Sequence, residues 1–346
     1  MSKGECLLKI AIVTDKSRMD FLPSEEGFKE DEQKKKTVEE VQKILSKKYN
    51  CIALVADDSI INQLKAENVD LVFNLCNGIR GDSKLAQLPA LLEFANIPYT
   101  GSSILGHTLA INKIYSSKIF RARGIPTPDF ISIYNVDDLN SLDIDFPVLI
   151  KPNDEGSSRG IHQDSLVFDM ETLTNKVEEE LDIYNPPIML NQYVEGREFS
   201  VGVIGNGENI SLLPIQEVDL SQLPEDLAKF YSFEVKAYYK DKTLYHIPAP
   251  LTQEEKELIE STAIKAYKAL SLRDYGRVDI ILKDGIPYVL EINSLPGLLK
   301  GKSALYRMAQ VTDLGYEGLI LKIVDTAIKR YDLFDDSFHS STIVNI

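Results

Sequence analysis

The first hundred residues alternate between short apolar runs and amphipathic stretches. The apolar runs are continuous, which is typical of strands buried on both faces, and they lie at 7–13, 51–57 and 69–75. Helical spacing of apolar positions predicts helices between or after these strands, near 31–48, 58–67 and 84–95. This order predicts an open α/β layer of the βαβ kind.

One further helix is predicted at 106–124, where Gly124 ends it. The Pro-spaced segment 125–130 follows and is predicted to be a linker. A domain boundary is therefore expected near 100–130.

From 131 onward the pattern predicts an α+β mixture. Strands are predicted at 146–152, 189–194 and 197–205, and a hairpin pairs 277–282 with 286–293. Thr252 and Glu255 have capping-box spacing, which predicts the start of a helix at 252–270. A last amphipathic helix is predicted at 316–330, followed by a loosely held tail.

Composition indicates a globular protein of two or three domains, with 346 residues, 44% hydrophobic and 26% charged. Acidic residues number 53 against 38 basic ones, so the formal net charge is -15. Such a surface repels a phosphate backbone, which disfavours general nucleic-acid binding. It does not exclude a nucleotide, because a few local cations and backbone N–H groups suffice to hold one.

The cysteines are Cys6, Cys51 and Cys76, an odd number without metal-ligand spacing, which is typical of reduced thiols in a cytosolic protein. The first apolar run is too short for a signal peptide, and no apolar stretch approaches the length of a membrane helix. A soluble, cytoplasmic protein is expected, with no membrane partner.

The predicted hairpin carries the strongest chemical signal. Glu291 and Asn293 are two apart on one strand and share a face, and antiparallel pairing brings Asp279 alongside them. Carboxylate and amide oxygens suit Mg²⁺ that also bridges substrate phosphates. The alternative is a solvated strand face with a surface salt bridge to Arg277.

The strand that ends at Lys151 runs into a Gly/Ser-rich loop. An ammonium and several backbone N–H groups in this arrangement can surround phosphate oxygens. Ser157 and Ser158 add hydroxyl donors, while Gly156 and Gly160 permit positive φ. The alternative is an ordinary surface loop.

Lys113, inside a mostly apolar helix, is a possible second phosphate contact, with a snorkelling lysine as the alternative. No GxGxxG motif follows a strand, no GxSxG motif is present, and the four histidines lack metal spacing. Dinucleotide binding and a hydrolase nucleophile are therefore unsupported.

The order of the motifs resembles the ATP-grasp ligases, in particular D-alanine:D-alanine ligase and its relatives, over roughly 68–330. The motifs are NGIRGDSKLAQLPALLEFANIPYTGS (77–102), the helix with Lys113, FPVLIKP with GSSRGI, EGREFSVGVIGN (195–206), FEVKAYYKDKT (233–243), and RVDIIL with YVLEINSLPG. The resemblance implies the ATP-grasp fold, in which an N-terminal open α/β domain precedes two α+β lobes that sandwich ATP. The domains it implies are 1–105, 106–190 and 191–335, with a tail at 336–346.

The family's reaction would be an ATP-driven ligation. ATP phosphorylates a carboxylate, an amine attacks the acyl phosphate, and an amide forms as phosphate leaves. Two Mg²⁺ ions are expected, with Mn²⁺ as a possible substitute. Such catalysis is mostly positioning and charge neutralisation and needs no protein nucleophile.

Residue by residue, the resemblance assigns the phosphates to Lys113 and Lys151, with Lys236 reaching the γ-phosphate. It makes Asp279, Glu291 and Asn293 the metal ligands and has Arg277 stabilise the tetrahedral intermediate. Glu198 would bind the ribose and Asn191 the adenine edge; Ser157 and Ser158 would close over phosphate, with Ser157 also catalytic; Ser303 would contact a substrate carboxylate.

The departures from the family concern the amino-acid pocket. The amino-terminal GGxSxExxVS segment is missing, and 14–28 reads TDKSRMDFLPSEEGF instead. Asn77 replaces a histidine and Ala237 a loop tyrosine. These changes predict a ligase for small amino-acid, carboxylate and amine substrates, with a genuine cell-wall D-alanine:D-alanine ligase as runner-up. A non-catalytic nucleotide-binding homologue is the third alternative, and a homodimer is possible in each case.

Overall fold

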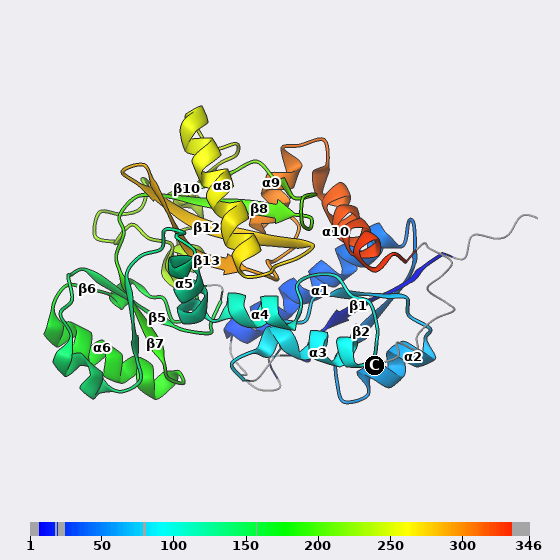
Figure 1. Cartoon of the computed structure of the whole chain (residues 1–346), viewed down its shortest axis with the longest axis horizontal. Coiled ribbons are helices and arrows are strands. Elements are labelled where there is room, and N and C mark those ends of the chain that lie inside the picture. The colour runs from blue at the N-terminus through cyan, green and yellow to red at the C-terminus, as the bar shows by residue number, and fades with distance from the viewer. Residues whose placement is uncertain (1–6, 18, 20–24, 79–80, 157, 334–346) are drawn as a thin grey trace, which may run out of the picture.

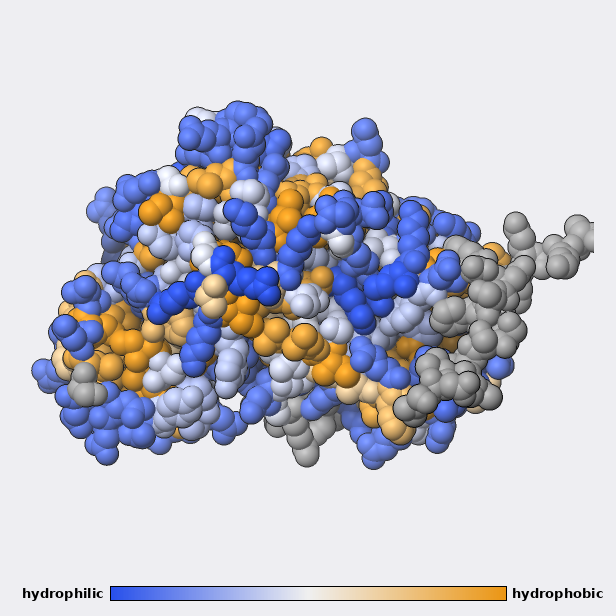
Figure 2. All heavy atoms as spheres, in the orientation of Figure 1, coloured by the Kyte–Doolittle hydropathy of each residue, from blue (hydrophilic) through white to orange (hydrophobic). Residues whose placement is uncertain are grey.

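The computed structural model in Figure 1 describes residues 7–17, 19, 25–78, 81–156 and 158–333. The strands of this part of the chain form three sheets, which follow one another along the sequence. Hydrophilic residues cover most of the face shown in Figure 2, with apolar residues visible at the lower left and in a band across the middle of the face. No helix of the described ranges is both long and apolar enough to span a bilayer.

The first sheet has the order β2-β1-β3 and is parallel, as the βαβ pattern predicts. Its strands are β1 (Lys9–Thr14), β2 (Asn50–Val55) and β3 (Leu71–Asn74), and the helices are α1 (Glu25–Leu45), α2 (Ile60–Ala66) and α3 (Gln87–Phe94). Helix α1 starts six residues before the predicted position. Residues 25–30, EEGFKE, lack an apolar period, but acidic residues in a first helical turn are favoured by the helix dipole.

The single helix predicted at 106–124 is wrong: the structure has α4 (Ile104–Ile111) and α5 (Lys113–Ala122). Asn112 breaks the helix with an extended backbone at ψ 99°, and its side chain accepts a hydrogen bond from the Tyr115 N–H. Asn153 accepts from the backbone N–H of Lys113 and of Ile114, each at 3.0 Å. The break therefore ties the start of α5 to the loop after Lys151.

The central sheet is antiparallel, with the order β4-β7-β5-β6. Its elements are β4 (Phe130–Ile133), β5 (Val148–Pro152), β6 (Leu166–Val167), α6 (Met170–Ile183) and β7 (Ile188–Gln192). Apolar residues of this sheet pack against Leu173 and Val177 of α6. The predicted limit between the second and third domains, after residue 190, falls within β7.

The third sheet has the order β11-β10-β8-β12-β13, with β9 beside β8. Its strands are β8 (Arg197–Ile204), β9 (Ser211–Leu212), β10 (Gln216–Asp219), β11 (Leu244–His246), β12 (Tyr275–Lys283) and β13 (Ile286–Asn293). The predicted hairpin is confirmed, and its turn residues Asp284 and Gly285 both have positive φ, as a type I′ turn requires. The apolar face of this sheet packs on α8 (Gln253–Ala269), whose Thr252–Glu255 capping box is confirmed.

The remaining helices are α7 (Phe233–Tyr238), α9 (Ala304–Gln310) and α10 (Gly315–Tyr331), with short 3₁₀ turns at Lys84–Ala86, Val136–Ser141, Gln163–Ser165 and Lys240–Lys242. Helix α10 shares one apolar cluster with the first sheet and α1, in which Ile323 and Val324 join Ile10 and Val41. Figure 1 shows α10 next to α1, far from the central sheet.

Candidate active site

A row of polar residues crosses the third sheet on the face opposite α8. Gln216 on β10 pairs with Ser200 on β8, Ser200 pairs with Asp279 on β12, and Asp279 pairs with Glu291 on β13. Directly opposed residues share a face, so the four side chains lie side by side. The alternating neighbours, such as Phe199, are buried under α8.

The three predicted metal ligands are brought together on this face. The Asn293 Nδ2 group donates to Asp279 Oδ2 at 3.1 Å and to Glu291 Oε1 at 3.2 Å, while Ser200 Oγ donates to Asp279 Oδ1 at 2.7 Å. Two carboxylates and an amide oxygen are a hard donor set that fits Mg²⁺, once the Asn293 amide turns its oxygen inward. The described residues contain no cluster of three His, Cys, Asp or Glu, so such an ion would depend on phosphate and water oxygens too.

Arg277 forms ion pairs with both carboxylates, Asp279 and Glu291. Its Nε and Nη2 donate to Asp279 at 2.8 and 2.6 Å, and Nη2 lies 3.9 Å from Glu291 Oε1. This is an ion pair, as the surface alternative required, but both side chains are largely buried. Burial raises the pKa of Glu291, yet the charges on Lys113 and Arg277 outweigh it and hold the pKa below its usual value.

Three lysines from other elements lie near Glu291: Lys113, Lys151 and Lys236. Lys113 and Lys151 are 5% and 8% exposed, so neither snorkels to solvent. Burial lowers the pKa of Lys151 to about 8, with Lys113 acting in the same direction and Glu291 opposing it. Burial and the charge of Arg277 lower the pKa of Lys236, on α7, to about 8. Lys151 lies near Lys113, and Lys236 lies near Arg277. A bound polyanion would offset the repulsion between these positive charges.

Asn191 lies on β7 of the central sheet, and Glu198 lies on β8 of the third sheet. Glu198 on β8 has its pKa raised to about 7 by burial and by the nearby Asp279 charge. Asn191 is 5% exposed on β7, opposite Leu149 of β5. Both lie near the segment 193–196, where the chain passes from one sheet to the other.

Among the described residues of the Gly/Ser-rich loop, Ser158 with φ 63° and Gly160 with φ 67° are left-handed. Gly156 permits a positive φ but does not adopt one. Gly160 must be glycine because a Cβ atom there would lie 2.3 Å from Pro152 Cγ. Ser158 Oγ donates to the Tyr231 carbonyl at 3.2 Å, just before α7. Ser157 lies outside the described residues.

Sequence reasoning missed a chain of ion pairs around this loop. Lys84 lies 2.7 Å from Glu155 Oε1, Arg159 lies 2.9 Å from Glu155 Oε2, and Arg159 also lies 3.3 Å from Glu30 Oε1 on α1. The pair Glu155–Arg159 lies within the loop sequence DEGSSRG, but Lys84 is 71 residues from Glu155 and Glu30 is 129 residues from Arg159. No local pattern could have identified these two long-range pairs.

Ser303, the predicted substrate contact, is the N-cap residue of α9 and is partly exposed. Its hydroxyl accepts a hydrogen bond from the Leu299 N–H at 2.8 Å. The hydroxyl proton is then directed away from that N–H and can be donated to an anion.

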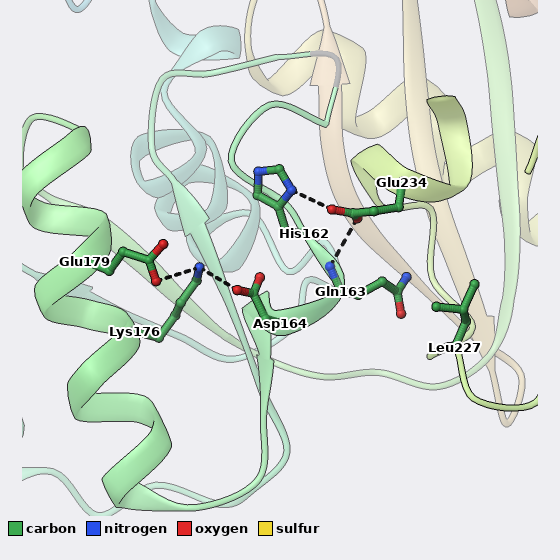
Figure 3. A pocket seen from close by; sticks show the side chains of 7 residues that line it. All are labelled: His162, Gln163, Asp164, Lys176, Glu179, Leu227 and Glu234. Atoms are coloured by element: carbon green, nitrogen blue, oxygen red, sulfur yellow. Dashed lines mark hydrogen bonds and ion pairs between the residues drawn. The ribbon is translucent and has the colours of Figure 1, made fainter. Parts of the chain in front are cut away.

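The segment carrying Lys236 is fastened to the central lobe by Glu234. Glu234 contacts His162 Nδ1 at 2.7 Å, the Gln163 N–H at 3.2 Å and the Ser232 hydroxyl at 2.9 Å. Figure 3 shows the contacts of Glu234 with His162 and Gln163, which lie beside an open cavity of about 490 Å³. The lining of this cavity includes none of the predicted site residues. The contacts define a latch, residues 162, 163, 232 and 234, that holds Lys236 over the site.

Replacing Glu234 by Ala removes the latch's central acceptor. We expect the segment around Lys240 and Lys242, both exposed, to be cut by trypsin at least roughly tenfold faster, because the hydrogen bonds of Glu234 to three groups are lost. Glu179→Ala is the matched control, because Glu179 lines the same cavity but contacts Lys176 on α6. Equal digestion of Glu234→Ala and wild type would refute the latch.

The lowered pKa values of Lys151 and Lys236 predict that binding of ATP at this site, which the resemblance implies, depends on pH. Near pH 8 each lysine is only partly protonated, and a bound triphosphate favours the charged form, so we expect binding to take up protons. Affinity should fall as pH rises above about 8. Calorimetry in buffers of different ionisation enthalpy measures the uptake, and Lys151→Met should reduce it. Proton release at pH 8 in wild type would contradict this expectation.

The sequence profile described as D-ala D-ala ligase C-terminus matches residues 119–325, more than half of the chain. The D-alanine–D-alanine ligase of Bacillus anthracis is 30% identical over 82% of this chain and 88% of its own length. The chain is a member of the D-alanine–D-alanine ligase family. An uncharacterized Sinorhizobium fredii protein, y4sG, is 36% identical over 77% of each chain.

The crystal structure of a Bacillus anthracis D-alanine–D-alanine ligase complexed with ATP has the same fold, with a TM-score of 0.71 and 24% identity over 94% of this chain and 99% of that one. The ATP-grasp fold expected from the sequence is thereby confirmed. As a member of the family, the chain is an ATP-dependent ligase that forms carbon–nitrogen bonds.

Proposed function

We propose that the chain is a Mg²⁺-dependent ligase that joins a small carboxylate to an amine through an acyl phosphate, with an amino-acid pocket that differs from that of D-alanine–D-alanine ligases. The observation that carries the proposal is the convergence of Lys113, Lys151 and Lys236 on Glu291, which pairs across the hairpin with Asp279. Arg277 contacts both carboxylates. Cations around two carboxylates suit a triphosphate held with a divalent ion.

In this proposal a carboxylate oxygen of the first substrate attacks the γ-phosphorus of ATP, and ADP leaves. The amine then attacks the acyl carbon, loses a proton and expels phosphate. Lys113, Lys151 and Lys236 neutralise the phosphates, while Arg277 stabilises the oxyanion of the tetrahedral intermediate. Bound to Asp279, Glu291 and Asn293, Mg²⁺ would supply further neutralisation of the phosphate charge.

The remaining assignments belong to the same proposal. Asn191 and Glu198 would receive the adenine and the ribose, near the connection between the two sheets. Ser158 would act from the phosphate loop together with Ser157, and Ser303 would donate to a substrate carboxylate. Two metal ions, the domain limits at 105, 190 and 335, and a homodimer remain proposals.

The ion pairs next to α1 support an amino-acid pocket that differs from that of D-alanine–D-alanine ligases. Arg159 and Glu30 form an ion pair there, and the buried Asp15 at the end of β1 lies 2.9 Å from the Lys34 ammonium. Asn77 is exposed, with no imidazole at its position. Of the segment 14–28, residues 18 and 20–24 lie outside the described residues. The runner-up, a cell-wall D-alanine–D-alanine ligase, would need other groups to bind the ammonium of D-alanine.

The test is release of ADP and phosphate with MgATP and a panel of D- and L-amino acids, singly and in pairs, with products identified by mass spectrometry. Turnover with a pair other than two D-alanines would support the proposal. A D-alanine dipeptide from D-alanine alone would restore the runner-up. ATP binding without turnover of any pair would overturn the proposal in favour of a non-catalytic homologue.

A further inference from the structure

Arg307 stands one turn after Ser303 on α9, at the edge of the active-site face. Its Nε donates to Gln216 Oε1 at 2.8 Å, and its Nη1 donates to the carbonyl of Lys302. The guanidinium lies over the ring of Tyr245 at 3.8 Å from the centroid. These contacts fix the position of the charge without neutralising it.

Pairing across the sheet places these supports on the same face as the catalytic groups. Gln216 begins the polar row that continues through Ser200 to Asp279. Tyr245 on β11 is opposite Val218, which is opposite Glu198 on β8. Arg307 therefore extends the row at the end opposite Glu291, on the β10–β11 side of the sheet.

The environment of Arg307 contains no counter-ion. Arg277, Arg197 and Arg330 each have a carboxylate within 3 Å, but no carboxylate in the described ranges lies within ion-pair distance of Arg307. Burial lowers its pKa, and the charge of Arg277 adds to this against the opposing effect of Tyr245 and Tyr231. A partly desolvated guanidinium next to another cation is costly unless an anion joins it.

We propose that Arg307 binds an acidic side chain of the amine substrate, so that the attacking amine belongs to an acidic amino acid. The inference rests on the proposed ligase function and names the class of its second substrate. Arg307 is one turn from Ser303, which would hold the substrate's main carboxylate, whereas Lys113 and Lys151 act on Glu291 at the other end of the row. A molecule with two carboxylates can engage Ser303 and Arg307 together, which an uncharged side chain cannot do.

The experiment compares nearly isosteric amine substrates, glutamate against glutamine and aspartate against asparagine, in both enantiomers. Each is offered with MgATP and D-alanine, or with the carboxylate that the amino-acid panel identifies. We expect wild type to prefer the acid by about ten- to hundredfold in kcat/KM, as a charge-assisted pair implies. Arg307→Met should bring the ratio close to one, and Arg307→Lys should keep part of the preference.

Arg123→Met is the matched control, because Arg123 is an exposed arginine beyond α5, and it should keep the wild-type ratio. Equal kcat/KM for acid and amide in wild type would overturn the proposal. So would a fall of both by the same factor in Arg307→Met with an unchanged melting temperature, because that result indicates only a structural role.

If no pair is ligated, calorimetry on the protein loaded with ADP and Mg²⁺ still decides the inference. Glutamate or aspartate that binds wild type but not Arg307→Met would support the anion subsite while the ligase proposal fails. Absence of binding by either acid would overturn the subsite itself.

Discussion

Replacing Glu291 by Gln is expected to lower Mg²⁺-dependent turnover by roughly 100- to 1000-fold and to leave the fold intact. Glutamine keeps the volume but removes one of the two paired charges, and loss of one group that stabilises charge in the transition state costs about 3–4 kcal/mol in activation free energy. Lys113, Lys151 and Arg277 then lose a counter-ion. ATP should therefore bind the variant at least as tightly as wild type in the presence of a chelator, while the response to added Mg²⁺ is lost.

Phosphate release against Mg²⁺ concentration and calorimetry with metal-free ATP measure the two effects. Glu254→Gln, an exposed position on α8, should match wild type in both measurements. Turnover by Glu291→Gln with an unaltered Mg²⁺ dependence would remove Glu291 from the proposed metal ligands.

Lys151→Met is expected to weaken ATP binding by about 100-fold. Lys151 is 8% exposed and lies near Lys113, Glu198 and Glu291, so the bond of its ammonium to a phosphate would be charge-assisted and shielded from water. Methionine fills the space of the aliphatic stem, and the melting temperature without nucleotide should change little. Calorimetric titration with ATP and Mg²⁺ measures the loss.

The control for this change is Lys283→Met at the exposed end of β12, which should bind ATP as wild type does. Wild-type affinity in Lys151→Met would show that Lys151 is a buried structural lysine, and the phosphate assignments would then rest on Lys113 and Lys236 alone.

The groups predicted from sequence were those fixed by local geometry. Asp279, Glu291 and Asn293 lie on one hairpin, and strand alternation with a two-residue turn determines their register. The break at Asn112 could not be predicted, because apolar positions continue through it. The start of α5 is held by hydrogen bonds from the Lys113 and Ile114 N–H groups to Asn153, which lies 39 residues after Ile114. Lys113 was predicted inside a helix, whereas it is the first residue of α5.

The positions of the charged side chains around the site depend on contacts between residues far apart in the sequence. For that reason they could not be predicted from the sequence. Arg159 joins Glu30 across 129 positions, and Arg307 joins Gln216 across 91. In the sequence, Arg307 is a lone cation in the apolar stretch ALYRMAQ, a pattern shared by many surface arginines. Only the structure shows that Arg307 lies at the end of the polar row, because Arg307 bonds to Gln216 and Gln216 pairs with Ser200.

Helix α10 has a consequence for the order of folding. The cluster beneath the first sheet contains Ile10 and Val41 together with Ile323 and Val324, and Arg330 bridges Asp274 and the Tyr99 carbonyl. During synthesis the N-terminal α/β unit must therefore keep part of its apolar surface uncovered until α10, which begins at Gly315, has been made. The nascent chain should depend on chaperones over this interval, and ribosome-bound chains that end before residue 315 should expose that surface to apolar dyes.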